Sequence, residues 1–318
     1  MAYPEFEAVL RKLTDDVAKI NLAVEKRLAS MYRDSYLLVK AMAQDLYASI
    51  GAEITLAEAN KRARLENIQA NIAKEYKKMT GKALDLAVDT SARNYTEAFY
   101  RYQYAGDHAL GLQLQWGVLP VDAIRASVYS QQSGLTIIKT WAKNVDVELA
   151  NIQAALTRGI ATGSSYMTTA RGIKDQFERG LNDALRVVRT ESHRAFSEGS
   201  LEAHNRAVEL GLDVARVWRA TLDNRTRDQH GAMDGQEADK DGYFTAPDGS
   251  KAKGPGLFGI ASQDINCRCI AIDELRDYRP TSRRINKEKE LGPDITFRQW
   301  AEPQGWTLED GWPRASMI

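Results

Sequence analysis

The chain has 318 residues and is electrically balanced, because 43 Lys and Arg residues offset 43 Asp and Glu residues. A net charge of zero argues against a general electrostatic grip on nucleic acid and leaves only local basic stretches as candidates. Two cysteines exclude a disulfide scaffold, and no stretch reaches the roughly 18 uncharged apolar residues that a membrane span needs. The N-terminus lacks the cationic and apolar segments of a secretory signal, so we expect synthesis in a reducing compartment and no membrane anchor.

The first part of the chain is predicted to be helical. Residues 5–50 are expected to form one long helix, because apolar residues recur every seven positions along one face. The two series are Phe6, Leu13 and Ile20, and Leu10, Val17 and Val24. About three heptads is the lower limit for a coiled coil, so a helix packed in a bundle is the favoured interpretation.

A second helix is predicted over residues 56–80, and it carries a basic face. The basic residues are Lys61, Arg62, Arg64, Lys74, Lys77 and Lys78. A solvated face is the usual meaning of such a run, with phosphate contact as the alternative. The aromatic stretch at 94–106 places Tyr95, Phe99 and Tyr102 at helical spacing, which favours core packing over a ligand site.

Three further helices are predicted over residues 121–160, 164–179 and 183–211, the last ending at Gly211. The pattern changes near residue 212. Residues 213–223 alternate as a strand, residues 235–266 hold six glycines and two prolines, and residues 266–275 alternate again. The predicted fold is therefore mostly α, with a long helical N-terminal region and a small α+β C-terminal domain. That domain contains a short β-sheet and a long Gly-rich loop.

Both cysteines lie in this C-terminal part, and their spacing suggests a metal site. Strand alternation would put the thiols of Cys267 and Cys269 on one face. A capping box formed by Thr226 and Gln229 would start a short helix that carries His230 toward them.

Zinc prefers four ligands of this kind, so a fourth would come from Asp234, Asp223 or water. The ligand count favours the alternative, in which His230 and Asp223 hydrogen-bond the loop and the cysteines are small buried apolar groups. A Cys–His nucleophile is disfavoured, because nothing distinguishes one thiol from the other.

Three segments, taken in order, resemble a known family. They are RTESHRAFSEGSLEA at 189–203, VWRATLDNRTRDQHGAMDGQ at 217–236 and NCRC at 266–269. They are similar to the head morphogenesis family of tailed phages, the Mu F-like minor head proteins, over roughly residues 150–275. The resemblance implies framework roles for matching positions, and no established catalytic activity. These positions are Arg189, Thr190, Glu191, Trp218, Asp223, Arg225, Thr226, Arg227, His230, Asp234, Gly235, Cys267, Arg268 and Cys269.

The resemblance implies a virion protein of the capsid interior or portal vertex, made in the host cytoplasm and acting in head assembly, with DNA ejection as a further role. Its expected partners are the portal protein or the major capsid protein, and packaged DNA through the basic stretches. We expect residues 1–150 to serve docking or self-association into a homo-oligomer, residues 151–275 to form the Mu F-like domain, and residues 276–318 to form a basic, Trp-bearing tail. The alternatives are a zinc-dependent hydrolase or nuclease and a DNA-binding module.

The charged residues of these motifs also lead to physical expectations. Asp223 is expected to tie its turn through Arg225 and Arg227 by charge-assisted hydrogen bonds. Arg189 and Glu191 lie too close on a helix to face each other, so each is expected to find a different partner.

Overall fold

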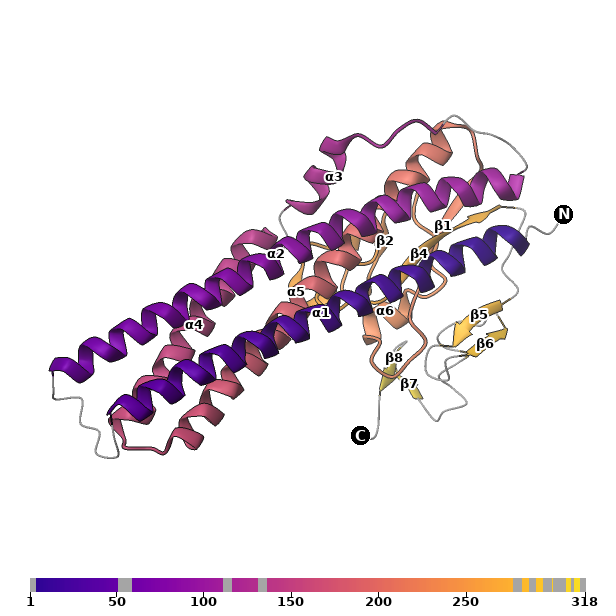
Figure 1. Cartoon of the computed structure of the whole chain (residues 1–318). Coiled ribbons are helices and arrows are strands. Elements are labelled where there is room, and N and C mark those ends of the chain that lie inside the picture. The colour runs from indigo at the N-terminus through magenta and orange to yellow at the C-terminus, as the bar shows by residue number, and fades with distance from the viewer. Residues whose placement is uncertain are drawn as a thin grey trace. The chain divides into compact units, whose positions relative to one another are not determined.

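The computed structural model describes residues 4–50, 59–110, 116–130 and 136–276, and the short segments 282–285, 290–293, 299, 307–309 and 312–314. Five helices make up most of it: α1 (Pro4–Ile50), α2 (Ala59–Leu110), α3 (Val121–Val128), α4 (Ile137–Ala161) and α5 (Tyr166–Glu209) (Figure 1). The mostly helical fold with a small strand-bearing C-terminal part is thus confirmed. No helix among the described residues has the length and apolar character needed to cross a membrane.

The C-terminal part is built on short two-stranded sheets. Strand β1 (Val214–Arg219) pairs antiparallel with β4 (Ile270–Leu275), and β2 (Phe244–Thr245) pairs with β3 (Lys251–Ala252). The short helices α6 (Asp228–Ala232) and α7 (Ala261–Asp264) lie between these strands in the chain. Two more hairpins follow, β5 (Ser282–Ile285) with β6 (Glu290–Pro293) and β7 (Thr307–Glu309) with β8 (Trp312–Arg314). The rest of the predicted tail, including half of its basic residues, lies outside the described residues.

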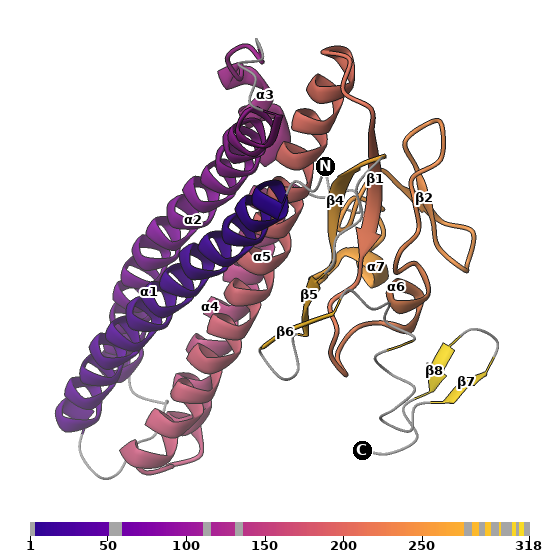
Figure 2. The ribbon, with the colours of Figure 1, turned by 90° about the vertical axis from the view of Figure 1, so that its right-hand side faces the viewer.

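The chain divides into two compact units, each assembled from separated stretches of sequence. One unit contains residues 20–90 and 135–189, and the other contains residues 1–19, 91–134 and 190–318. The first unit is a helical bundle in which parts of α1, α2, α4 and α5 run side by side (Figure 2). Its core includes Leu28, Ile72, Trp141, Ile152 and Phe177, all less than a tenth exposed. The preference for a bundle over a coiled coil at α1 agrees with this core.

The second unit contains the strands and holds two main apolar clusters. One is formed by Tyr95, Phe99 and Tyr102 of α2 together with Trp116, which confirms that the aromatic stretch packs in a core. The other surrounds Trp218 of β1 and includes both cysteines. The candidate site lies in this second cluster.

Several predicted helix boundaries were wrong. The helix predicted over 121–160 is two helices, α3 and α4. The helices predicted over 164–179 and 183–211 are one, because Gly180 does not break α5. A Cβ at Gly180 would lie 2.9 Å from the carboxyl group of Glu148 and the hydroxyl of Tyr76, so glycine permits close packing there. The predicted end at Gly211 is confirmed: its φ is +87°, and Leu212 N–H bonds the Ala207 carbonyl as in a Schellman cap.

The two strands are shorter than predicted. Strand β1 stops at Arg219, because the next amide, Ala220 N–H, donates to Asp234 Oδ1 at 2.7 Å. Strand β4 begins only at Ile270, since Asn266 adopts a left-handed φ of +56° just before the cysteines. The Cys-x-Cys segment is therefore a loop that follows the left-handed Asn266 and leads into β4.

Candidate metal centre

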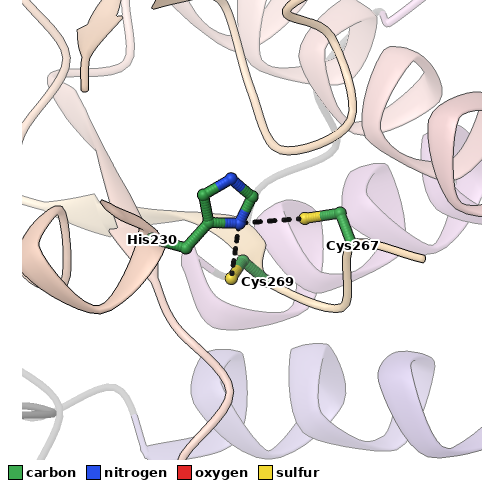
Figure 3. Close-up of side chains that lie close together, drawn as sticks. All are labelled: His230, Cys267 and Cys269. Carbon is green, nitrogen blue, oxygen red and sulfur yellow. Dashed lines mark hydrogen bonds between the residues drawn. The ribbon is translucent and has the colours of Figure 1, made fainter. Parts of the chain in front are cut away.

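Three side chains from two segments converge in the second unit. His230 comes from α6, and Cys267 and Cys269 come from the loop that leads into β4 (Figure 3). The imidazole Nδ1 lies 3.5 Å from the Sγ of Cys267 and 3.6 Å from the Sγ of Cys269. Their ligand atoms all lie within 4.8 Å of one another, so this group can bind a metal ion. The predicted meeting of this imidazole with both thiols is present in the structure.

The predicted reason for that meeting was only partly right. Both thiols do face the same ring, but they do so before the strand begins. The loop is held by two contacts: Asn266 N–H donates to Thr190 Oγ1 at 3.2 Å, and the Arg227 guanidinium donates to the Ile265 carbonyl. These contacts, together with the left-handed Asn266, orient the two sulfur atoms.

The helix that carries His230 also starts differently from the prediction. Its N-cap is Arg227, with no side-chain cap, so the capping box of Thr226 and Gln229 is wrong. The Thr226 hydroxyl instead donates to the Thr221 carbonyl, and it therefore closes the preceding turn. Gln229 has a different contact, with the side chain of Gln263.

The carboxylates considered as a fourth ligand have other contacts. Asp234 accepts the Ala220 amide, and it is not in the group of close ligand atoms among the described residues. Asp223 accepts two hydrogen bonds from the Arg268 guanidinium, the Nη2–Oδ1 bond measuring 2.8 Å. Among the described residues, the candidate ligands that lie together are therefore one imidazole and two thiols.

Aromatic side chains enclose the group. The Trp218 ring meets the His230 ring edge-on at 5.3 Å, and the Phe258 ring stacks on it at 6.0 Å. His230, Cys267 and Cys269 are 1%, 4% and 3% exposed. Such burial excludes bulk water and strengthens any electrostatic interaction inside the site.

The two thiols differ in acidity. The hydrogen bond from Cys269 lowers the pKa of Cys267 against the opposing effect of burial. Burial raises the pKa of Cys269 well above its ordinary range. Because a metal binds thiolates, metal binding here releases protons.

The turn around Asp223 is tied mainly by Arg268. Burial acts to raise the pKa of Asp223, but the Arg268 hydrogen bonds and the Arg225 amide lower it overall. The Arg225 side chain is 75% exposed and lies 3.8 Å from the carboxylate, whereas Arg227 bonds the Ile265 carbonyl. The prediction that Arg225 and Arg227 both tie this turn was therefore wrong for Arg227.

The remaining framework positions have individual partners. Arg189 donates to both carboxylate oxygens of Glu25 at 2.7 Å, and Glu191 accepts from Arg194 at 2.9 Å. The expectation that Arg189 and Glu191 find different partners is confirmed. Gly235 has a φ of +79° and bonds the Trp218 carbonyl, which explains why glycine occupies this position.

Two polar groups in this unit were not predicted. The first is Gln263, whose Oε1 lies 3.0 Å from His230 Nε2. The second is Asp273, a buried carboxylate that contacts Tyr102, His204 and Arg216. These partners are separated from Asp273 by 57 to 171 residues, so no local spacing indicates them.

Comparisons with known proteins agree with the motif order. Residues 150–272 match the family described as Phage Mu protein F like protein. The chain is 28% identical over 290 residues to minor head protein GP7 of Bacillus phage SPP1, covering 89% of this chain and 92% of GP7. It is also 28% identical over 276 residues to NAD(+)--arginine ADP-ribosyltransferase EFV of Enterococcus faecalis (strain ATCC 700802 / V583). That match covers 87% of this chain but only 56% of the Enterococcus protein. No solved structure matches the chain.

Proposed function

The chain belongs, through residues 150–272, to the Phage Mu protein F like family, and from this we propose that it is a minor head protein acting in head assembly at the capsid interior or portal vertex. One observation carries the proposal: the similarity to SPP1 GP7 extends along 89% of this chain and 92% of GP7. A match of that extent includes the region of the long helices as well as residues 150–272. DNA ejection is a further role that the same similarity makes worth testing.

We further propose that zinc is a structural clip bound by His230, Cys267 and Cys269. A tetrahedral zinc with bonds of about 2.0–2.1 Å to nitrogen and 2.3 Å to sulfur separates these ligand atoms by about 3.6 Å. The Nδ1–Sγ distances of 3.5 and 3.6 Å fit that spacing. Moreover, a single imidazole lone pair cannot accept good hydrogen bonds from two thiols at once, whereas a cation satisfies all three groups.

The burial of the site supports a structural role over a zinc-dependent hydrolase or nuclease. A catalytic zinc keeps an open position for water or substrate. Here the three ligands are at most 4% exposed, and aromatic rings cover the imidazole. The zinc clip would join α6 to the start of β4 and so stabilise the Gly-rich loop between them.

ADP-ribosyl transfer is the second candidate function, because one relative carries that name. The chain spans 56% of that relative, so a large part of the Enterococcus protein has no counterpart here. We propose that the shared part is the head-protein module and that this chain has no transferase activity. Incubation with labelled NAD+ and arginine-rich acceptor proteins tests this, and labelling of an acceptor would contradict it.

The helices supply candidate surfaces for partners. Leu22 and Leu37 of α1 are each 52% exposed, which suits docking onto the portal protein, the major capsid protein or a second copy. Arg64, Lys74, Lys77 and Lys78 of α2 are exposed, and they are the candidates for contact with packaged DNA. A steep salt dependence of DNA affinity would support the DNA contact, and no binding at low salt would remove it.

The experiment that tests the main proposal is assembly. The chain is co-expressed with the portal and major capsid proteins of the phage that encodes it, and heads are purified by sedimentation. We expect the chain to co-sediment with heads and with isolated portal complexes. Heads that form with normal yield and infectivity when the chain is omitted would contradict a role in head assembly.

A further inference from the structure

A buried side-chain amide connects the candidate metal centre to an exposed aspartate. Gln263 of α7 is 4% exposed, and its Oε1 lies 3.0 Å from His230 Nε2, the ring nitrogen remote from the thiols. Its Nε2 donates to Asp248 Oδ2 at 2.9 Å and also to Gln229 Oε1. Gln263 therefore lies between His230 and Asp248.

The orientation of this amide follows from its neighbours. A carboxylate only accepts hydrogen bonds, so the Gln263 NH2 group must face Asp248. The other oxygen of Asp248 is occupied, because Oδ1 accepts from Ser250 N at 2.9 Å and from Ser250 Oγ at 2.6 Å. Consequently the Gln263 carbonyl oxygen faces His230, where it can only accept.

The orientation of the amide determines the protonation of the ring. Since Gln263 Oε1 accepts from His230 Nε2, that nitrogen carries the proton of the neutral imidazole. The lone pair then lies on Nδ1, which faces Cys267 and Cys269. A metal-bound histidine commonly donates its other ring N–H in this way, which fixes the ring and makes it a better ligand.

We propose that Gln263, oriented by Asp248, is a positioning residue that holds His230 as the Nε2–H tautomer and presents Nδ1, with the two thiolates, to a soft divalent cation such as Zn²⁺. This inference rests on the zinc clip proposed above. It extends the site from three ligands to a chain of contacts that ends at an exposed carboxylate in the β2–β3 turn.

The sharpest test is Asp248→Asn, which keeps the size of an exposed side chain. Asparagine has one acceptor oxygen, which the two Ser250 donors hold, so its NH2 group turns toward Gln263. The Gln263 amide then turns over together with that of Gln229, whose Oε1 accepts from Gln263 in the wild type. Gln263 then donates to His230 Nε2, and the ring proton moves to Nδ1. The tautomer is read from the ring nitrogen shifts of ¹⁵N-histidine-labelled, metal-free full-length protein by NMR.

We expect Nε2–H in the wild type and Nδ1–H in Asp248→Asn, together with a zinc affinity lowered about 10- to 100-fold. The matched control is Asp239→Asn, since Asp239 caps a nearby turn through the Asp241 and Tyr243 amides and does not contact Gln263. The rescue is Gln263→Glu combined with Asp248→Asn. Glu at 263 accepts from both His230 and the new amide, so it should restore the tautomer and the affinity.

The readouts separate the two proposals. One outcome is that the wild type has Nε2–H and the tautomer shifts in Asp248→Asn, but the wild type binds no Zn²⁺ in competition with a chelating dye. In that case the zinc clip is wrong, and so is the part of this inference that presents Nδ1 to a cation. An unchanged tautomer in Asp248→Asn would overturn the positioning role even if zinc binds. Equal zinc affinity in spite of a changed tautomer would overturn it as well.

Discussion

Replacing Glu148 with glutamine should change how the stability of the helical bundle depends on pH. Glu148 of α4 is 6% exposed and accepts a hydrogen bond from the Tyr76 hydroxyl. Burial, with a smaller contribution from Asp183, raises the pKa of Glu148 from 4.5 to about 7, against the lowering effect of the Tyr76 bond. In the folded bundle Glu148 is therefore mainly the neutral acid below about pH 7.

The magnitude follows from linkage. The shift from 4.5 to about 7 is worth about 3 kcal/mol at about 1.4 kcal/mol per pKa unit. Because the folded pKa is the higher one, this stability is fully present below pH 4.5, falls as the pH rises, and is lost above about pH 7. Glutamine resembles the neutral acid and does not titrate. Glu148→Gln should therefore gain up to about 3 kcal/mol relative to the wild type between pH 4 and pH 8.

The assay is urea unfolding of the wild type and Glu148→Gln at intervals from pH 4 to pH 8, followed by helical circular dichroism. Subtracting the two free energies removes the contribution of every other titrating group that the variants share. A difference in stability that stays constant across this pH range would refute the reasoning, because it would mean that Glu148 titrates alike in the folded and unfolded chain.

Three further predictions concern packing, the Asp223 turn and metal removal. Gly199→Ala should lower the free energy of unfolding, measured in urea, by about 1–3 kcal/mol or more. The reason is that a Cβ at position 199 would lie 2.3 Å from the backbone oxygen of Tyr95. The control Gly81→Ala meets nothing within 4 Å and should stabilise α2 by up to about 1 kcal/mol. Arg268→Ala should lower the free energy of unfolding by about 1–3 kcal/mol, because it leaves the largely buried Asp223 without its guanidinium partner. Arg276→Ala, whose ion pair with Asp213 is exposed, should lower it by almost nothing, and equal losses would contradict the importance of the part-buried Arg268–Asp223 pair. A chelator should lower the Tm of the wild type in scanning calorimetry and leave the Tm of the Cys267→Ser, Cys269→Ser double variant unchanged. Equal decreases in Tm for the two proteins would argue against the zinc clip.

Patterns within a single element were readable from the sequence, and contacts between distant elements were not. The long helices followed from apolar periodicity, and the end of α5 followed from Gly211. The predicted gap between residues 179 and 183 is absent, and Gly180 within it allows the close approach of Glu148 and Tyr76 from other helices. The structural role of Gly180 thus depends on residues that are distant from it in the sequence.

The same distinction between local patterns and distant contacts applies to the candidate site. Two thiols separated by one residue, with an imidazole on a nearby short element, could be singled out from residue type as candidate ligands that would lie together. Gln263 could not be recognised, because it lies 33 residues from His230 on the very short helix α7, where no periodicity predicts which side chain faces which. Asp234 and Asp223, which were considered with water as a fourth ligand, accept hydrogen bonds from the Ala220 amide and the Arg268 guanidinium, and neither contact is visible in the local sequence.

The acidic residues of this domain are used as hydrogen-bond acceptors for its backbone, as the structural role proposed above requires. A long loop with little regular structure leaves many backbone N–H groups without strand or helix partners, and burying such groups unpaired is costly. Asp264 accepts from the amides of Phe258 and Ile260, Asp234 from that of Ala220, and Asp223 from that of Arg225. A carboxylate already committed to backbone amides is poorly placed to act as a general base. The motif residues that look reactive in the sequence are thus used to hold the loop that brings His230 to the two thiols.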